Sequence, residues 1–302
     1  MNNNVISRLA SIEIQTVSWC NAHCTVCPWP QIKESVPRQS MTEDIWHKAL
    51  EGVRALDPDV IMPYMNNEPL LDKKIDSRIL DLRAASPRSQ IEFSTNGLLL
   101  TEKLSEFLVN NADIILISLF GYDEKSNVEM MGKGMSYDKI KNNLLQLKKA
   151  REDSGSQCII NIVKIINSPF ASNDSVLKDW IFWEDEGISV RYYDFVDRCT
   201  NVGDFKQRNH TLQAYGCDYN TPVEDTSILY NGDVIFCSFD WRQEYIMGNL
   251  HKDSLFDIVN GDEYNRIRNM VDGVVESDDN FLCKKCANCK TRRLEIKRET
   301  GK

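Results

Sequence analysis

Three of the ten cysteines lie close together near the start of the chain, in a C-x3-C-x2-C pattern: Cys20, Cys24 and Cys27. Three thiolates on one short loop can bind three irons of a cubane cluster and leave the fourth iron open to a chelating ligand. A structural zinc site instead prefers four protein ligands in two C-x2-C halves. Disulfide pairing would leave one of the three thiols over. The spacing therefore favours an iron–sulfur cluster with one open iron.

A second group of cysteines lies in the last third of the chain. Cys217 is followed by Gly232, and a G-x4-C spacing then leads to Cys237. Three further thiols follow at equal spacing, at Cys283, Cys286 and Cys289. Four cysteines can hold either a cubane cluster or a tetrahedral zinc ion, so the spacing alone leaves both metals open.

Composition and charge narrow the class of protein. The 302 residues are 42% hydrophobic and 27% charged, which is typical of a globular rather than a disordered chain. A formal net charge of −9 argues against nucleic acid as a partner and is compatible with a cationic small substrate. No apolar stretch approaches the length of a membrane span, and the first residues show no export signal. We therefore expect a cytoplasmic protein without a membrane partner, whose thiols stay reduced.

Strand-like and helical segments alternate along the first two thirds of the chain. Strands are expected at Ile12–Ser18, Val60–Tyr64, Ile91–Ser94, Asp113–Leu119, Ile159–Ile166 and Ser189–Phe195. Helices are expected at Met41–Leu56, Asp72–Ala85, Thr101–Asn110, Tyr137–Arg151 and Asn173–Glu186. Apolar strands joined by helices predict an α/β fold with a parallel sheet, either a partial (β/α)6 TIM-like barrel or a doubly wound sheet. In a barrel, chemistry is expected at the carboxyl ends of the strands.

The pattern changes after the sixth strand. Ser227–Tyr230 and Asp233–Phe236 predict a hairpin around an Asn-Gly turn, and a helix is expected over Ser254–Met270. This region is too small and too rich in cysteine to rest on apolar burial alone, so a metal centre is expected to stabilise it. We therefore predict two domains, a barrel over 1–205 and a small cysteine-rich domain over 206–302.

Placed after a first strand, the C-x3-C-x2-C loop resembles that of the radical S-adenosylmethionine (SAM) superfamily. The Met65–Leu71 segment is similar to the family's G-G-E-P-L-L stretch, and Ser94–Gly97 and Ser118 match its polar strand ends. The resemblance favours the partial barrel. It implies that the first three cysteines hold a 4Fe–4S cluster whose open iron binds SAM, and that the reduced cluster cleaves SAM to a 5′-deoxyadenosyl radical.

The same resemblance implies a set of SAM contacts. Val26 stands where the family usually has an aromatic residue beside adenine, and Trp29 is the expected substitute. The other implied contacts are Asn66, Asn67, Glu68, Ser94, Asn96 and Ser118.

The second cysteine group resembles the SPASM pattern and its shorter twitch form, which carries one auxiliary 4Fe–4S cluster. The resemblance implies that four cysteines ligate this cluster, with Cys289 as the alternative to the last of them: Cys217, Cys237, Cys283 and Cys286.

Over the whole chain, the motifs are similar to those of the 2-deoxy-scyllo-inosamine dehydrogenases and of aminoglycoside epimerases. This implies hydrogen abstraction from a small polar substrate, with dehydrogenation of a sugar or aminocyclitol alcohol as the expected reaction. Epimerisation with a free cysteine as hydrogen donor and modification of a ribosomal peptide are alternatives. A further alternative is a protein that is not an enzyme, either an electron carrier or a structural metal protein. A flavodoxin or ferredoxin is the implied electron donor.

Residues that act on the substrate are expected among spare thiols and strand ends. Cys199 and Cys289 are the candidate hydrogen donors. Arg191 and Asp194 would position a hydroxyl or an amine, or take up its proton. Further candidates on the same face are Tyr64, Asn66, Tyr193 and Asp197.

Overall fold

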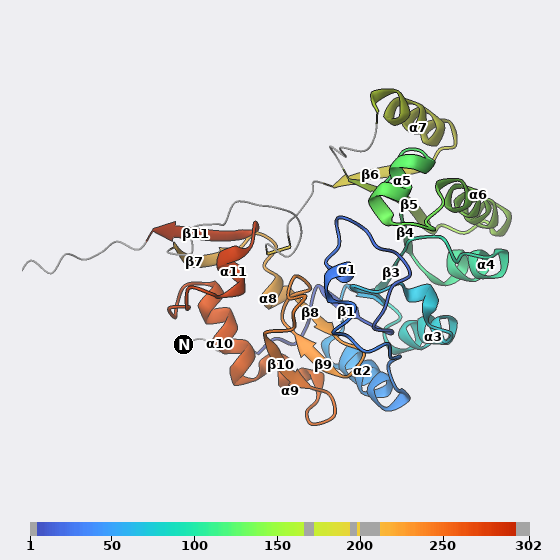
Figure 1. Ribbon diagram of the computed structural model, residues 1–302. Helices are drawn as coiled ribbons and strands as arrows, with labels where there is room; N and C mark the ends of the chain where they lie inside the picture. Colours follow the sequence, from blue (N-terminus) through green and yellow to red (C-terminus); the bar gives the residue numbers. More distant parts are fainter. Residues whose placement is uncertain (1–4, 166–171, 194–197, 200–211, 294–302) are drawn as a thin grey trace, which may run out of the picture.

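The computed structural model describes residues 5–165, 172–193, 198–199 and 212–293 (Figure 1). In chain order, the elements up to β6 are β1 (Ser11–Ile14), α1 (Trp29–Ile32), α2 (Glu43–Leu56), β2 (Val60–Met62), the 3-10 helix η1 (Pro69–Leu71), α3 (Ile75–Ala85), β3 (Gln90–Thr95), α4 (Glu102–Asn111), β4 (Ile114–Ser118), α5 (Glu124–Met131), α6 (Tyr137–Ser154), β5 (Ile159–Ile165), α7 (Asn173–Asp185) and β6 (Ser189–Tyr193). The later elements are β7 (Leu212–Cys217), α8 (Thr221–Glu224), β8 (Asp225–Ile228), β9 (Asp233–Ile235), β10 (Ile246–Asn249), α9 (Leu255–Asn260), α10 (Asp262–Val271), α11 (Leu282–Lys285) and β11 (Cys289–Arg293). None of the described helices is long and apolar enough to span a bilayer.

The strands of the first part form the predicted parallel sheet. Within the described residues, one sheet of nine strands has the order β10-β9-β8-β1-β2-β3-β4-β5-β6. Strands β1 to β6 pair in parallel with their neighbours. Helices α2, α3, α4 and α6 lie along the outer side of this curved sheet (Figure 1). The α/β prediction and the partial barrel are therefore confirmed.

The same sheet continues into the cysteine-rich part of the chain. Strand β8 pairs in parallel with β1, from Ser11 opposite Asp225 to Ile14 opposite Ile228. The predicted hairpin follows as antiparallel β8 and β9, and Gly232 adopts a left-handed φ of 84° in its turn. Strands β7 and β11 form a separate two-stranded sheet. The predicted boundary between 1–205 and 206–302 lies outside the described residues, so this division stays a prediction.

Two predicted elements differ from the structure. The first strand was expected to reach Ser18 but ends at Ile14, because the chain then leaves the sheet and Ser18 N–H donates instead to the carbonyl of Gln39 at 3.0 Å. The single helix expected over Ser254–Met270 is two helices, α9 and α10. The extended backbone of Gly261, with φ −72° and ψ 167°, separates them. Both helices bury one face in the same core, so the apolar period continues through the break.

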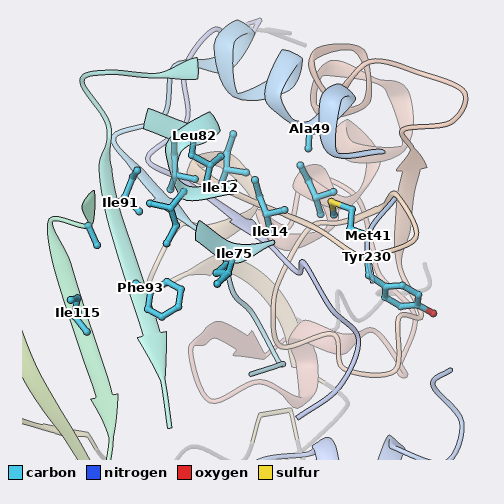
Figure 2. Close-up of a cluster of buried hydrophobic side chains, with 14 of the residues drawn as sticks. Ile12, Ile14, Met41, Ala49, Ile75, Leu82, Ile91, Phe93, Ile115 and Tyr230 are labelled. Atoms are coloured by element: carbon cyan, nitrogen blue, oxygen red, sulfur yellow. The ribbon is translucent and has the colours of Figure 1, made fainter. Parts of the chain in front are cut away.

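The strands divide their side chains between two environments. Ile12, Ile14 and Phe93 are fully buried and point toward the helices that cover β1 and β3 (Figure 2). Side chains alternate along a strand, so Glu13 and Glu92 lie on the opposite, inner face of the barrel, where both are half-buried. The outer face of the sheet is thus apolar, whereas the inner face carries charge.

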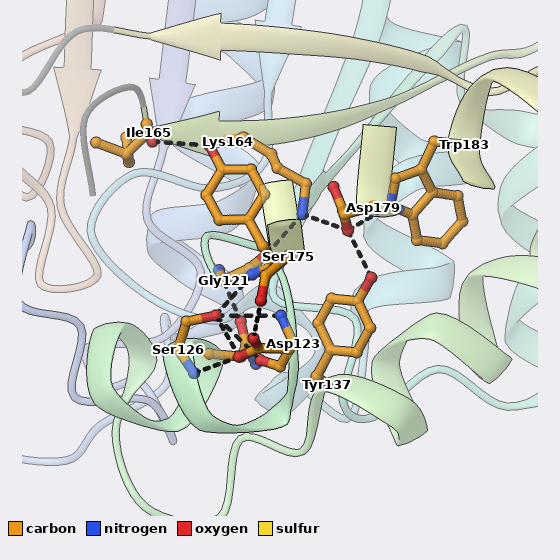
Figure 3. A network of polar contacts seen from close by, with 11 residues as sticks. Gly121, Asp123, Ser126, Tyr137, Lys164, Ile165, Ser175, Asp179 and Trp183 are labelled. Atoms are coloured by element: carbon orange, nitrogen blue, oxygen red, sulfur yellow. Dashed lines mark hydrogen bonds and ion pairs between the residues drawn. The ribbon is translucent and has the colours of Figure 1, made fainter. Parts of the chain in front are cut away.

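A buried ion pair fastens β5 to the helices outside it (Figure 3). Lys164 Nζ lies 3.1 Å from Asp179 Oδ1 of α7 and donates to the carbonyl of Gly121 at 2.6 Å. Asp179 also accepts hydrogen bonds from Tyr137 Oη at 2.5 Å and from Trp183 Nε1 at 3.0 Å. Burial lowers the pKa of Lys164 to about 8, and the charge of Asp179 opposes that shift. This group joins three elements that are distant in sequence.

We expect Asp179→Ala to lower the free energy of unfolding by about 3–5 kcal/mol, because it leaves the Lys164 ammonium buried without its partner. The matched control is Asp174→Ala, which removes an exposed pair with Lys178 on the same helix and should cost below about 1 kcal/mol. Urea unfolding of the anaerobic protein, followed by circular dichroism, measures both. Equal losses in the two variants would show that the buried pair contributes no more than a surface pair.

Candidate metal centres and cofactor site

The first cysteine loop, between β1 and α1, is held against the end of α5. The His23 N–H donates to the carbonyl of Met131 at 2.9 Å, and the Thr25 N–H donates to that of Met130 at 2.8 Å. Gly132 ends α5 with a φ of 99°, and a Cβ there would lie 2.9 Å from the Cβ of His23. A glycine is therefore required both by the backbone and by the close approach of the loop.

The three thiols of this loop lie near enough to act on one another electrostatically. Burial raises the pKa of Cys24, and the charges of Cys27 and Cys20 raise it further. Burial also raises the pKa of Cys20 to about 12, although its Sγ accepts a hydrogen bond from the Ala22 N–H at 3.3 Å. A bound metal cation would instead stabilise the ionised thiols and lower these pKa values, since cysteine binds metal as the thiolate. Three converging thiols of this kind fit the open-iron cluster.

Glu68 joins the segment after β2 to the end of β3. Its Oε1 accepts from Thr95 Oγ1 at 2.6 Å and from the Leu70 N–H at 3.1 Å, and its Oε2 accepts from the Asn96 N–H at 2.8 Å. The Glu68 N–H donates to the carbonyl of Trp19 beside the cysteine loop. Burial raises the pKa of Glu68 to about 7, and the hydrogen bonds oppose that shift. This carboxyl therefore fixes two segments predicted to bind SAM relative to the cluster loop.

The amides predicted to bind SAM lie around this carboxyl. Asn96 Nδ2 donates to Asn21 Oδ1 at 2.7 Å, next to the first cysteine. Asn66 is hydrogen-bonded to Gln15, which follows β1. The Nδ2 of Asn67 is buried without a partner in the described part of the chain. A ligand acceptor such as the SAM carboxylate would satisfy this donor.

The remaining predicted SAM contacts differ in exposure. Ser94 and Ser118 are half-buried near the carboxyl ends of β3 and β4. Val26 is half-buried, whereas Trp29 is 3% exposed and its Nε1 has no partner among the described residues. Trp29 is thus packed into the protein, and its place beside adenine stays a prediction.

The thiols of the second group come from the end of β7, the segment after β9, α11 and its end, and the start of β11. Burial raises the pKa of Cys283, and the charges of four other thiols raise it further: Cys237, Cys289, Cys286 and Cys217. No three His, Cys, Asp or Glu side chains of the described residues stand close enough to hold one metal ion directly. In a cubane, each thiolate binds a different iron, so its ligands need not be so close.

Two thiols of the second group share a feature with Cys20. Cys237 Sγ accepts from the Phe239 N–H and Cys286 Sγ from the Asn288 N–H, both at 3.4 Å. In each case the donor is the amide two residues ahead, which stabilises a thiolate. Cys289 instead directs its thiol to the carbonyl of its neighbour, Lys290, at 3.5 Å. Cys286 is the expected fourth ligand and Cys289 its alternative, and the choice between them stays a prediction.

Comparison with family models identifies both halves of the chain. A radical SAM superfamily model matches residues 14–170, which is more than half of the chain. The chain belongs to the radical SAM superfamily. A model for SPASM, an iron-sulfur cluster-binding domain, matches residues 217–290. The protein is therefore an enzyme that uses SAM with a 4Fe–4S cluster, and the SPASM match identifies the second cysteine group as an iron–sulfur rather than a zinc site.

Solved structures share this radical SAM fold. BtrN in complex with AdoMet and 2-DOIA has a TM-score of 0.60 and 20% identity over 93% of each chain. Streptococcus suis SuiB bound to its precursor peptide SuiA has a TM-score of 0.70 and 16% identity over 94% of this chain and 71% of that one. anSMEcpe with bound AdoMet and the Cp18Cys peptide has a TM-score of 0.66 and 15% identity over 92% and 86%. No curated protein sequence matches the chain.

The residues predicted to act on substrate are only partly brought together. Arg191 of β6 donates through Nε and Nη2 to the amide oxygen of Asn161 on β5, at 3.3 and 3.2 Å. Cys199 is buried beside Cys286 rather than at a strand end. Tyr193 is 46% exposed at the end of β6. Asp194 and Asp197 lie outside the described residues, so their roles in the radical SAM reaction stay predictions.

Sequence reasoning missed two carboxyls on the inner face of the barrel. Glu13 and Glu92 each stand between two buried apolar residues of a strand. A charged residue at the central position of a short apolar run is costly unless it faces a polar interior. That pattern is visible in the sequence and could have marked both positions.

We expect Cys286→Ala to reduce the iron content of the reconstituted enzyme from about eight to about four per chain, because one cubane loses a ligand. Cys289→Ala is the matched control and should keep about eight irons. Iron and sulfide analysis of anaerobic protein measures both. The reverse result would make Cys289 the ligand.

Glu68→Gln should weaken SAM binding about tenfold or more, because an amide group cannot accept all three hydrogen bonds that the carboxylate accepts. The change is measured by titrating SAM against the reduced cluster signal in electron paramagnetic resonance. Glu51→Gln, on the exposed side of α2, is the control and should bind SAM normally. Unchanged affinity in Glu68→Gln would separate this carboxyl from the cofactor site.

Proposed function

We propose that this enzyme dehydrogenates a secondary alcohol of a small amine-bearing polyol, such as a sugar or an aminocyclitol. It works in the cytoplasm with a flavodoxin or ferredoxin as electron donor. When bound, SAM and its cluster supply a 5′-deoxyadenosyl radical, and the auxiliary cluster supplies an electron acceptor. The residues of the protein must then hold the amine and the alcohol of the substrate in place and accept the hydroxyl proton.

The observation that carries this proposal is a polar group on the inner face of β8, β1 and β3, joined by a tyrosine just after β2. Ser227 lies opposite Glu13 in the β8–β1 register, and its Oγ donates to Glu13 Oε2 at 2.6 Å. Tyr64 Oη donates to Glu92. Burial raises the pKa of Tyr64, and the nearby Glu92, Glu13 and Tyr193 raise it further. Two carboxyls and a phenol therefore face the same interior.

This group lies between the two cysteine sets. Burial raises the pKa of Cys237, an expected auxiliary ligand, and the nearby charge of Glu13 adds to that shift. Burial also raises the pKa of Glu13 and that of Cys27, in the first set, and the charge of Arg198 opposes both shifts. A substrate that reacts with a radical formed at the first set and passes an electron to the second must occupy the space between them.

The electrostatic environment on the inner face of the barrel suits the ammonium group of a substrate. Burial raises the pKa of Glu13 to about 7, so its negative charge is poorly compensated by the protein. A substrate cation would provide that compensation, and a hydroxyl beside it could pass its proton to the same carboxyl. The negative net charge of the chain agrees with a cationic substrate.

The structural neighbours support two substrate classes. The structural match with BtrN, solved with 2-DOIA, covers 93% of each chain. SuiB, solved with a precursor peptide, has the higher TM-score, so peptide modification is the competing proposal. Cys199, a candidate hydrogen donor for epimerisation, is buried against Cys286. That position favours dehydrogenation over epimerisation.

The reaction is tested by anaerobic incubation with SAM, reductant and matched pairs of aminocyclitols and neutral cyclitols. Equal amounts of ketone and 5′-deoxyadenosine from the amine-bearing member support the proposal. Solvent deuterium at an inverted carbon would identify an epimerase instead. Turnover of peptides alone would identify a peptide-modifying enzyme.

Glu13→Gln should raise KM for the amine-bearing substrate about 10- to 100-fold, because a hydrogen bond between charged groups is lost. KM for the neutral analogue should change far less. Glu106→Gln, exposed on α4, is the matched control. Equal effects on both substrates would assign Glu13 to the structure of the barrel rather than to amine recognition.

A further inference from the structure

We propose that Cys199 is a positioning residue of the auxiliary site: its thiol donates a hydrogen bond to the sulfur of Cys286 and thereby raises the reduction potential of the auxiliary cluster. The inference uses the iron–sulfur assignment of the SPASM domain and does not depend on the identity of the substrate.

The contact itself is a hydrogen bond between two thiols. Cys199 is 4% exposed, and its side chain is hydrogen-bonded to that of Cys286. Cys237 and Cys283 are also near enough to act on it electrostatically. A cysteine that ligates iron is a thiolate and can only accept, so Cys199 must be the donor once the cluster is bound.

The backbone at this position is held in an unusual conformation. Arg198 and Cys199 have φ values of 45° and 59°, two consecutive left-handed residues without a glycine. Such residues cost free energy and persist only where the surrounding structure holds them.

Contacts of the Arg198 side chain with two aromatic rings stabilise this conformation. Its guanidinium lies 5.3 Å from the ring centre of Phe239 and 5.9 Å from that of Trp241. Both rings belong to the segment that directly follows Cys237, so cation–π contacts fasten the turn to the auxiliary site. The turn that carries Cys199 is therefore held beside the segment that follows Cys237.

Cys199 is a thiol beyond the four that the auxiliary cluster is expected to use. A cubane has four irons, and the expected ligands already supply one thiolate for each: Cys217, Cys237, Cys283 and Cys286. Cys286 accepts from the Asn288 amide as well, so the Cys199 thiol adds a second donor to the same sulfur.

Hydrogen bonds to a ligand sulfur stabilise the more negative, reduced form of a cluster. A second donor on Cys286 thus makes the auxiliary cluster easier to reduce. Such tuning suits a cluster that must take up an electron, as the proposed dehydrogenation requires.

The test is a redox titration of the auxiliary cluster in the full, reconstituted chain, monitored by electron paramagnetic resonance. The signal of the SAM-binding cluster is recognised because it changes when SAM is added. We expect a more negative midpoint potential in Cys199→Ala than in the wild type. Cys199→Ser keeps a donor and should lie closer to the wild-type value. Both variants should retain about eight irons.

Cys158→Ala is the matched control, because it removes another buried thiol that bonds to the carbonyl of Ile159 instead. It should leave the potential unchanged. A fall to about four irons in Cys199→Ala would make Cys199 a ligand, and an unchanged midpoint would show that the hydrogen bond has no effect. If Cys199→Ala does not fold, the Cys199→Ser midpoint and iron content decide. None of these readouts requires turnover, so their failure is distinct from a failure of the proposed reaction.

Discussion

The parallel pairing of β8 with β1 is the constraint on which both metal centres depend. β1 leads directly into the first cysteine loop, and β8 turns back through antiparallel β9 toward Cys237. Because β9 runs opposite to β8, Cys237 returns toward the end of the sheet where β1 begins. The two thiol groups are therefore set on either side of Glu13 by backbone hydrogen bonds, which do not depend on the side chains that the substrate would contact.

Side chains alternate between the two faces of each barrel strand, so the residues that stabilise the fold and those available for chemistry lie on opposite faces. Apolar side chains on the outer face, such as Ile12 and Phe93, bind the sheet to its helices, and the Lys164–Asp179 pair fastens its far edge (Figures 2 and 3). The inner face is then free to carry groups that are costly to bury. Glu68, in the segment after β2, is satisfied by three donors of the protein, whereas Glu13 on the inner face has fewer partners and retains capacity for a ligand.

The sequence was most informative where function depends on neighbours along the chain. The first cysteine loop, the Glu68 segment and the alternating strands all follow from local spacing. The structure confirms the alternating strands and joins the Glu68 segment to the loop through the Glu68 N–H, whereas the ligands of both stay predictions. Pairing between Ser11 and Asp225 leaves no local signal, because it depends on which strand edge remains open after the whole chain has folded. Likewise, Cys199 had no motif around it, and its contact with Cys286 exists only in three dimensions.

Cys286 and Cys289 show why equal spacing does not mean equal chemistry. Each follows the previous cysteine after two residues, so the sequence treats them alike. Cys286 directly follows α11 with an extended backbone, and the turn after it, at residues 287–288, brings the amide of Asn288 back onto its sulfur. Cys289 begins β11 and pairs with Cys217, and an extended strand carries its later amides away from the sulfur. The start of a strand, rather than the motif, thus gives Cys289 different surroundings from those of Cys286.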